Sequence, residues 1–464
     1  MNTQDTICAI ATAQGGAIGV IRISGKDAIA ITDRIFTPVG KHPLPLSERK
    51  AYTMAFGHIR QDDGEIIDEV LIGLFKSPHS YTGEDCVEIS CHGSSFILQQ
   101  VMQLLIRKGC RAAGPGEFTQ RAFLNGKMDL SQAEAVADLI ASSSAATHRM
   151  AMNQMRGGFS RELSALRERL LHLTSLMELE LDFSDHEELE FADRSELETI
   201  AGDIEKVISG LVHSFSVGNV LKNGIPVAIV GETNAGKSTL LNTLLNEEKA
   251  IVSDIHGTTR DVIEDTVNLS GITFRFIDTA GIRDNHDTIE NMGIARSFHK
   301  MEQAEIVLWV VDNTCAEAQI RQLSPRILPL CSNKQLIILL NKSDQVSAVP
   351  TKLSGLPENT VTLSISAKEK TGIQELQNLL VKTASVPELT SSDLIVTNVR
   401  HYEALSLALE DIHRVQNGLQ THLSGDFISQ DLRECLFHLA EIVGGEITAD
   451  EVLGNIFMKF CIGK

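Results

Sequence analysis

The chain has 464 residues, a length that suits two or three domains, and its 61 acidic against 41 basic residues give a net charge of −20. A chain this acidic is repelled by nucleic acid at long range, which excludes a generally basic RNA-binding protein; any RNA contact needs a local basic patch or a partner that supplies one. Residues 1–10 do not resemble a signal peptide, no apolar run reaches about 18 residues, and the 8 cysteines include no Cys-x-x-Cys pair, so we expect a cytoplasmic protein with reduced thiols and no membrane span.

Residues 1–118 alternate short strands with helices and predict an N-terminal α/β domain. Residues 17–24 and residues 86–92 are expected to form two of its strands. A period of two places Cys86, Glu88, Ser90 and His92 on one face of the second strand, and Val87, Ile89 and Cys91 on the other. Because Cys86 and Cys91 point to opposite faces, we do not expect these cysteines to form a metal site with His92.

Long amphipathic helices are predicted on both sides of the middle of the chain. In residues 119–217 a capping box, Ser131-x-x-Glu134, precedes leucines at helical spacing from Leu163 to Met177, and a further helix is expected over about 195–215. In residues 386–464 two apolar stripes follow, Leu405, Leu409, Ile412, Val415 and Leu419, then Leu432, Leu436, Leu439 and Val443. Since such helices need partners for their apolar faces, we favour one bundle split by an inserted domain over two separate helical hairpins.

Residues 218–385 alternate apolar strands with helices, a pattern that predicts a parallel, doubly wound sheet with strands at 225–230, 273–277, 306–311 and 336–340. The first strand leads into Gly231-Glu232-Thr233-Asn234-Ala235-Gly236-Lys237-Ser238, a phosphate-binding loop, and then into a helix expected to begin near Lys237. Backbone N–H groups and the helix N-terminus would hold the phosphates, Lys237 would reach the β- and γ-phosphates, and Ser238 would bind Mg²⁺.

Three further motifs follow in the order typical of a guanine-nucleotide switch: Asp278-Thr279-Ala280-Gly281, Asn341-Lys342-Ser343-Asp344 and Ser366-Ala367-Lys368. A buried Asp344 would accept hydrogen bonds from N1–H and the exocyclic amine of guanine, and the last motif would offer a backbone N–H to O6. Thr259, in the segment Gly257-Thr258-Thr259-Arg260-Asp261, is the expected second Mg²⁺ ligand, with Asp278 as its outer acidic partner and Gly281 near the γ-phosphate.

Ile282 follows Gly281, at the position where Ras-like GTPases place a glutamine that orients the attacking water. Hydrolysis would then need another group, and Asp284, Asp287 and Glu290 are the nearby carboxylates. Arg260 and Arg283 stay open as arginine fingers, and a cation held beside Asn234 would supply the missing positive charge.

With these motifs the chain resembles the MnmE (TrmE) family of tRNA-modifying GTPases over essentially its whole length. The motifs that distinguish this family lie outside the nucleotide-binding segment: Gly114-Pro115-Gly116-Glu117-Phe118, Arg121-Ala122-Phe123-Leu124-Asn125 and the terminal Cys461-Ile462-Gly463-Lys464. The resemblance implies a multidomain α/β and all-α fold, with an N-terminal α/β tetrahydrofolate-binding domain at 1–118, a split α-helical bundle at 119–217 and 386–464, and an inserted Ras-like P-loop G domain at 218–385.

The resemblance also implies site residues. Potassium-stimulated hydrolysis is expected, with K⁺ held at Asn234, Ser253, Ile255 and Thr258. Glu290 would position the water, and the other catalytic candidates are Lys237, Asp278 and Cys461. Folate contacts map onto Arg22, Glu88, Lys127 and Lys464. The GTP site would comprise Asn234, Ala235, Gly236, Lys237, Ser238, Thr239, Ser253, Thr258, Thr259, Asp278, Thr279, Ala280, Gly281, Asn341, Lys342, Asp344, Ser366, Ala367 and Lys368. Cys461 is either a thiol at the modification site or a tail residue packed beside Phe460, and both alternatives stay open.

The implied reaction modifies carbon 5 of the wobble uridine (U34) of tRNA, adding an aminomethyl or carboxymethylaminomethyl group. It would use a one-carbon tetrahydrofolate (the 5-formyl or methylene form) and an FAD-containing partner, MnmG (GidA). We expect a homodimer whose G domains dimerise across the nucleotide, and a heterotetramer with that partner. The alternative is a ribosome-associated assembly GTPase, which would carry a basic RNA-binding module that this acidic chain does not show.

Overall fold

The computed structural model describes residues 5–13, 15–40, 43–142, 144–182, 194–248, 265–277, 301–332, 334–346, 356–357, 360–384, 394–445 and 463. They belong to two compact units. The first combines Met1–Ala141, Ala151–Ser209 and Glu403–Lys464, and the second combines Ser142–Met150 with Gly210–Tyr402. Among the described helices, none is long and apolar enough to cross a membrane.

The first unit begins with a seven-stranded sheet of order β3-β4-β5-β6-β2-β1-β7. Its strands are β1 Ile7–Ile10, β2 Ile18–Ser24, β3 Phe36–Pro38, β4 Thr53–Arg60, β5 Ile66–Phe75, β6 Cys86–His92 and β7 Arg111–Ala112. Neighbouring strands are antiparallel except for the parallel pair β1 and β7. The two predicted strands are therefore confirmed as β2 and β6, and the alternation in β6 buries Cys91 while leaving Glu88 half-buried and His92 exposed.

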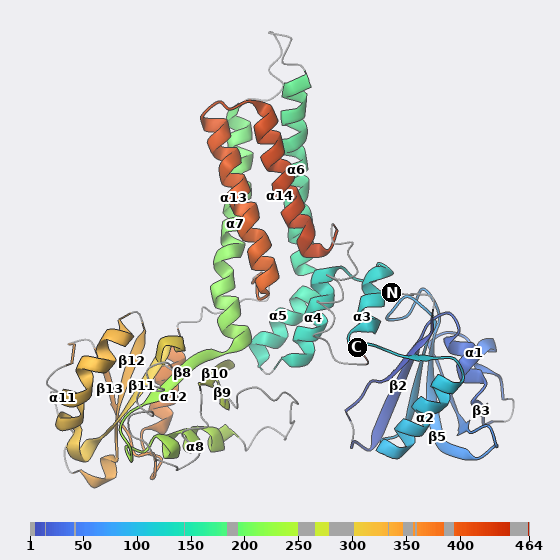
Figure 1. The fold of residues 1–464 in the computed structure, drawn as a ribbon, viewed down its shortest axis with the longest axis horizontal. Helices are drawn as coiled ribbons and strands as arrows, with labels where there is room; N and C mark the ends of the chain where they lie inside the picture. The colour runs from blue at the N-terminus through green and yellow to red at the C-terminus, as the bar shows by residue number, and fades with distance from the viewer. Residues whose placement is uncertain are drawn as a thin grey trace. The chain divides into compact units, whose positions relative to one another are not determined.

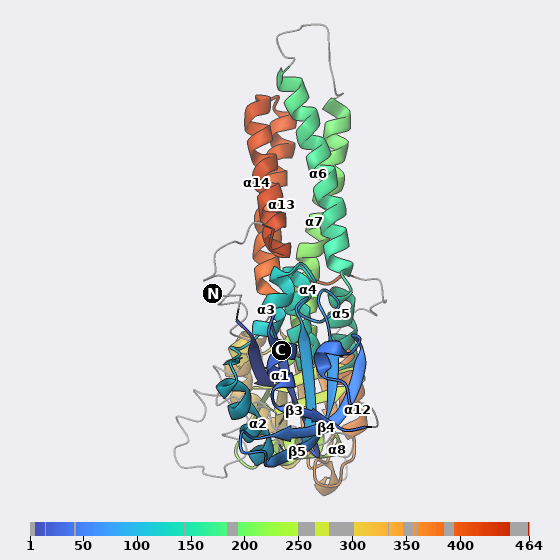
Figure 2. The ribbon, with the colours of Figure 1, turned by 90° about the vertical axis from the view of Figure 1, so that its right-hand side faces the viewer.

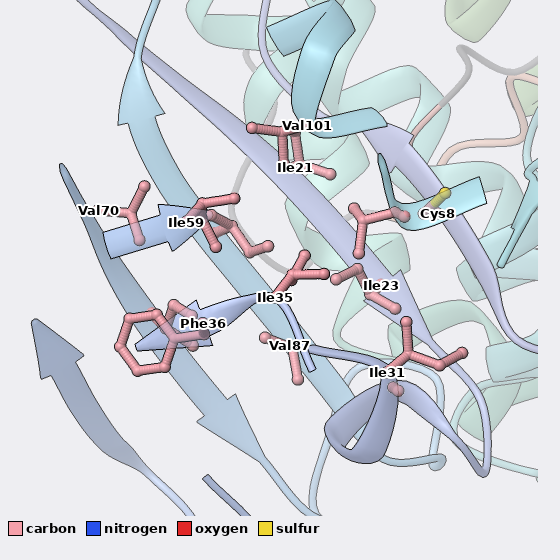
Figure 3. Packing of buried hydrophobic residues seen from close by; sticks show 14 of the residues in the cluster. Cys8, Ile21, Ile23, Ile31, Ile35, Phe36, Ile59, Val70, Val87 and Val101 are labelled. Atoms are coloured by element: carbon pink, nitrogen blue, oxygen red, sulfur yellow. The ribbon is translucent and has the colours of Figure 1, made fainter. Parts of the chain in front are cut away.

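Two helices, α1 Ala28–Asp33 and α2 Ser95–Arg107, contribute buried side chains to a core on one face of this sheet. Figure 3 shows that core, in which Ile21, Ile23 and Val87 from the strands meet Ile31 and Val101 from the helices. Because strand side chains alternate between faces, Arg22 and Glu88 lie on the opposite face. A third helix, α3 Glu117–Leu124, contributes the fully buried Phe118 to a second cluster with residues of β1.

The helical part of the first unit contains α4 Leu130–Ala141, α6 Gly158–Asp182 and α14 Gly425–Val443, together with parts of α5 Ala145–Met155, α7 Arg194–Asn223 and α13 Val399–Gln420. The helices α6, α7, α13 and α14 run side by side as a long bundle (Figures 1 and 2). The predicted stripe of α6 is confirmed, since Leu163, Leu166, Leu170, Leu173 and Met177 are all buried. In α14 the buried stripe is Ile428, Leu432, Cys435, Leu439 and Ile442, so the predicted stripe holds only at Leu432 and Leu439.

The predicted capping box of α4 is wrong by two residues. The helix begins at Leu130, and the side chain of Asp129 accepts the backbone N–H of Gln132 at 2.9 Å. The side chain of Gln132 in turn accepts the backbone N–H of Asp129 at 3.0 Å. Asp and Gln complete the reciprocal pair as well as Ser and Glu do, so the residue types alone allowed either register.

The second unit contains a six-stranded sheet of order β13-β12-β11-β8-β10-β9. Its strands are β8 Ile225–Val230, β9 Asp265–Leu269, β10 Ile272–Phe276, β11 Ile306–Asp312, β12 Gln335–Asn341 and β13 Val361–Ser364. Helices α8 Lys237–Glu248 and α12 Ile373–Thr383 cover one face and α11 Ala316–Ile327 covers the other, as a doubly wound sheet requires. The described part of the chain also contains the short 3₁₀ helices η1 Leu46–Glu48, η2 Asn313–Cys315, η3 Leu328–Cys331 and η4 Ser343–Gln345.

The expectation of an entirely parallel sheet is wrong at one edge. Strand β9 pairs antiparallel with β10 through a tight turn at Ser270 and Gly271, whose φ angles are 53° and 85°. The sequence Asp265–Leu269 alternates polar and apolar residues, so it lacks the continuous apolar run by which buried parallel strands are predicted.

Candidate nucleotide-binding site

The predicted phosphate loop connects β8 to α8 at the carboxyl edge of the sheet, where ligands bind in doubly wound folds. Gly231 has φ 148°, and a Cβ there would lie 2.1 Å from the carbonyl oxygen of Val310. Gly236 has φ 99°, and a Cβ there would lie 2.1 Å from Nδ2 of Asn341. Both positions therefore require glycine, because the loop backbone passes directly against its neighbours. Asn234 is exposed in the same loop, with a left-handed φ of 63°.

Lys237, the first residue of α8, directs its ammonium group back over the phosphate loop. Its Nζ donates hydrogen bonds to the carbonyl oxygens of Gly231 at 3.0 Å and Glu232 at 2.8 Å. The cation thus lies at the N-terminus of a helix, where the backbone dipole also favours an anion. Ser238 and Thr239 follow in the first turn of the same helix.

Asn341 ties the phosphate loop to the loop that contains Ser366, Ala367 and Lys368. Its side chain is buried, donating from Nδ2 to the carbonyl oxygen of Ala235 at 2.8 Å and accepting at Oδ1 from the backbone N–H of Ala367 at 3.0 Å. Thr243 of α8 adds a second tie, since its hydroxyl donates to the carbonyl oxygen of Ala367 at 3.0 Å. The structure therefore brings the Asn341 motif into direct contact with the phosphate loop and connects the Ser366-Ala367-Lys368 motif to that loop through Asn341.

Asp344 lies in η4 with its carboxylate oriented by the neighbouring loop. The hydroxyl of Ser366 donates to Oδ1 of Asp344 at 2.6 Å and accepts the backbone N–H of Glu369 at 3.2 Å. The expectation that Asp344 is buried is wrong, because this residue is exposed. The side chain of Lys368 is also exposed, and its Nζ lies 3.8 Å from Glu369.

Sequence reasoning missed Asp312 and Gln319, two polar residues that support this site. Lys342 has a left-handed φ of 62° and donates from Nζ to Oδ2 of Asp312 at 2.5 Å. Burial raises the pKa of Asp312, but hydrogen bonds from Lys342 and Thr314 outweigh it and hold that pKa below its usual value. Gln319 accepts the backbone N–H of Asp312 and donates to the carboxylate of Glu232, both at 2.9 Å.

One sequence signal would have found Asp312. It ends the apolar strand β11 in register with Asn341, which ends the neighbouring strand β12. Polar residues at the carboxyl ends of adjacent parallel strands meet at one edge of the sheet.

Several predicted site residues lie outside the described part of the chain. They are Ser253, Ile255, Thr258, Thr259, Asp278, Thr279, Ala280, Gly281, Glu290, Cys461 and Lys464. The same holds for Arg260, Ile282, Arg283, Asp284 and Asp287.

A second polar cluster lies on the face of the N-terminal sheet opposite its helices. Arg22 and Glu88 are cross-strand neighbours, and their side chains form an ion pair at 2.8 Å. The guanidinium carbon of Arg22 lies 5.4 Å from the ring centre of Tyr81 and 5.7 Å from that of Phe118. Arg22 also donates to the carbonyl oxygen of Gly463 at 3.4 Å, which brings the end of the chain to this cluster.

Lys127 is a separate case among the predicted folate contacts. Its Nζ donates to the carbonyl oxygen of Pro78 at 3.0 Å, and its stem lies near Gly83. No contact of Lys127 with Arg22 or Glu88 is seen among the described residues. The structure therefore joins Arg22 and Glu88 directly but places Lys127 on the neighbouring loop.

The motif residues between Gly114 and Asn125 form hydrogen bonds and ion pairs that hold helix α3 next to the Arg22–Glu88 cluster. Glu117 accepts the backbone N–H of Gly114 at 2.8 Å and pairs with Arg121 at 3.1 Å. Arg121 is 3% exposed and also pairs with Asp5 at 2.7 Å and Glu84 at 3.2 Å. The side chain of Asn125 donates to the carbonyl oxygen of Thr82 at 2.7 Å. These bonds fix α3 to β1 and to the loop before β6.

Cys86 lies on the same sheet face as Arg22 and Glu88, where burial raises its pKa to about 12. A thiol with so high a pKa is not ionised near neutral pH. Within the described residues, no group of three His, Cys, Asp or Glu side chains is arranged to hold a metal ion.

Comparison with known proteins identifies relatives along the whole chain. A family model described as "GTP-binding protein TrmE N-terminus" matches residues 6–127, and one described as "MnmE helical domain" matches residues 130–461. The chain is 66% identical to the tRNA modification GTPase MnmE of Bacteroides thetaiotaomicron, covering 99% of this chain and 100% of that protein. It is 52% identical to the protein of the same name from Flavobacterium johnsoniae, with full coverage of both. A crystal structure of a variant of Aquifex aeolicus Era bound to GDP and AlF4⁻ is 27% identical over 40% of this chain and 66% of that one, with a TM-score of 0.26.

Proposed function

The chain belongs to the MnmE family of tRNA modification GTPases, and we propose that it hydrolyses GTP to drive the modification of carbon 5 of the wobble uridine (U34) of tRNA. The observation that carries the nucleotide half of this proposal is the buried Asn341, which joins the phosphate loop to the loop beside Asp344. A single side chain thereby connects the loop proposed to bind the phosphates with the loop proposed to bind the base.

In the nucleotide site, Lys237 would exchange its two loop carbonyl partners for the β- and γ-phosphates. Asp344, oriented by Ser366, would accept the N1–H and amine of guanine, and the stem of Lys342 would be held beside the base by Asp312. Mg²⁺, which neutralises developing phosphate charge when bound, fits the hydroxyl of Ser238 in the turn after Lys237. Thr259 would be its second ligand, and Glu290 would position the attacking water.

For the folate site, we propose that Arg22 and Glu88 bind a one-carbon tetrahydrofolate. Arg22 is held beside two rings and an acid, so its guanidinium has a fixed orientation on the sheet face opposite α1 and α2. A carboxylate acceptor and a guanidinium donor suit the donor-rich ring and anionic tail of a folate. Gly463, two residues after Cys461 in the sequence, contacts Arg22, which favours a role for the terminal motif at this site.

We further propose that the G domain is inserted into the helical domain. The helices before and after it, α6 and α14, pack on each other, and Glu178 of α6 pairs with Arg433 of α14 at 2.7 Å. The nucleotide state would then move the helical bundle rather than take part in the carbon chemistry. The oxidation chemistry would come from an FAD-containing partner of the MnmG (GidA) type, in a heterotetramer with a homodimer of this chain.

Potassium dependence is the first expected result. Asn234 is exposed, with its left-handed backbone fixed between Gly231 and Gly236, so its amide oxygen suits a K⁺ ion that supplies charge in place of an arginine finger. We expect GTP turnover by the purified protein to be at least about tenfold faster in KCl than in NaCl of equal concentration. Asn234→Ala should remove this difference without weakening GDP binding. Equal turnover of the unchanged protein in both salts would contradict the proposal.

Nucleoside analysis tests the modification itself. A strain that lacks this chain should accumulate tRNA with unmodified wobble uridine, and the intact gene should restore the modification. Complementation with Arg22→Ala should not restore it, although the purified variant should keep its GTP turnover because Arg22 lies in the first unit. Arg34→Ala, which changes an exposed arginine of the same unit, should restore modification fully. If the wobble uridine of the deletion strain still carries the modification found in the parent strain, that result would instead favour an assembly GTPase without a modification role.

A further inference from the structure

Four exposed arginines lie within a stretch of 14 residues, in the turn before helix α6 and in the first half of that helix: Arg156, Arg161, Arg167 and Arg169. We call them the α6 arginine surface. In the part of the chain that the structure describes, none of the four has a carboxylate within ion-pair distance. Arg161 instead donates to the backbone carbonyl of Arg156 at 3.0 Å, across the corner between α5 and α6. Only Glu162 and Glu168 interrupt the positive charge between residues 156 and 169.

Several other arginines of the same unit are matched by acids. Arg414 pairs with Asp411, Asp431 and Glu434, and Arg121 pairs with three carboxylates. Even the far half of α6 is matched, since Glu178 pairs with Arg433. In a chain of net charge −20, a cluster of unmatched arginines is therefore a local departure from the surrounding charge. It is the kind of basic patch that contact between this acidic chain and RNA would require.

The surface is also rigid. Gly157, with φ 74°, makes the turn between α5 and α6, and Gln132 of α4 donates to the carbonyl oxygen of Met155 at 3.1 Å. Beyond the turn, the leucines of α6 are buried in the bundle, which fixes the direction of the helix. Arg161 and Arg169 are eight residues apart, about 12 Å along the helix axis. That length corresponds to roughly three or four phosphates of one duplex strand.

We propose that the α6 arginine surface binds the phosphate backbone of the tRNA substrate. The inference rests on the role in tRNA modification given above and adds the place where the RNA is held. Guanidinium groups are weakly hydrated and bind phosphate oxygens through two parallel hydrogen bonds, so arginine suits this contact better than lysine. Contacts of this kind position the RNA without reading its sequence.

The test measures the salt dependence of tRNA binding by the full chain. Fluorescence anisotropy of labelled tRNA is recorded from 0.05 to 0.3 M KCl, roughly the range over which phosphate contacts dominate. A variant with Arg156, Arg161, Arg167 and Arg169 changed to Gln should bind at least about tenfold more weakly near 0.1 M salt. The slope of log affinity against log salt should fall by about 2 to 3.

A matched control removes the same charge elsewhere: Lys26, Arg34, Lys50 and Arg107, all exposed, are changed to Gln. This control should bind tRNA as the unchanged protein does. Replacement of the four α6 arginines by Lys should keep most of the slope, which a packing role for the arginines would not predict. An unaltered circular-dichroism spectrum and an unaltered thermal unfolding transition verify that each variant is folded.

The proposal for the α6 arginine surface would be overturned if the control variant lost as much tRNA affinity as the α6 variant. It would also be overturned if the salt slope of the α6 variant were unchanged. Either result would leave the proposed function intact. If the unchanged protein does not bind tRNA at any salt concentration used, the surface is overturned, and the proposed function is then decided separately by the nucleoside analysis of the deletion strain.

Discussion

Asp344→Asn is expected to lower the affinity for GTP about a thousandfold and to create affinity for xanthosine triphosphate. Guanine presents two donors, N1–H and the amine, and the carboxylate would accept both; an asparagine amide would offer a donor where the guanine amine also donates. Xanthine has a carbonyl oxygen in place of that amine, so the asparagine would pair with it. Titration with fluorescent analogues of both nucleotides measures the change directly.

Ser366→Ala is the matched control for this exchange. It removes the hydroxyl that donates to Asp344 at 2.6 Å but leaves the carboxylate in place. Losing one hydrogen bond to a charged group should lower the affinity for GTP about tenfold and should not create affinity for xanthosine triphosphate. If the Asp344→Asn variant still prefers GTP, the proposal that Asp344 binds the guanine base is contradicted.

Arg121→Met is expected to destabilise the N-terminal sheet by about 3–5 kcal/mol, the usual result of leaving buried charges without their partner. Arg121 is 3% exposed; its removal would take the cation from Glu84 and would leave Glu117 and Asp5 with Arg111 alone. Hydrogen-exchange mass spectrometry should show protection of β1, β2 and α3 reduced by about two to four orders of magnitude.

Two controls separate this effect from general damage. Arg433→Met breaks the Arg433–Glu178 pair, whose side chains are 68% and 45% exposed, and should cost less than about 1 kcal/mol. The single tryptophan, Trp309, is buried in the second unit, so its fluorescence should report an unchanged unfolding transition there in both variants. Unreduced protection of β1, β2 and α3 in Arg121→Met would show that the acids find other partners.

The same cluster determines how acid acts on the N-terminal sheet. Burial raises the pKa of Glu117, but hydrogen bonds from Arg111, Gly114 and Arg121 outweigh it, so the pKa in the folded state lies below the usual value of 4.5. A depressed pKa contributes stability above the unfolded-state value, and this contribution is lost as pH falls through the folded-state pKa. The free energy of unfolding of this unit is therefore expected to decrease as the pH falls below the usual value of 4.5.

Local patterns predicted some elements closely and missed others for identifiable reasons. The strand β8 coincides with its prediction because a continuous apolar run ends at a glycine. The edge strands β9 and β13 were missed because each is partly exposed to solvent. Such strands tolerate polar residues, which interrupt the apolar run by which strands are predicted. Asp312 and Gln319 were missed because their roles depend on contacts with Lys342 and Glu232, which lie far from them in the sequence.

The sequence by itself determined the nucleotide chemistry of this protein, because the phosphate-binding and guanine-binding groups occupy short contiguous motifs whose backbone geometry is local. Tertiary structure alone decided which distant residues share a site. Asn341 reaches the phosphate loop across 106 positions, and Arg22 reaches Gly463 across 441. The unmatched charge of the α6 arginine surface is also a tertiary property, because whether an arginine has a carboxylate partner depends on which helices pack around it. A spacing along the chain does not specify a distance in space, so these sites become visible only when the strands and helices have packed.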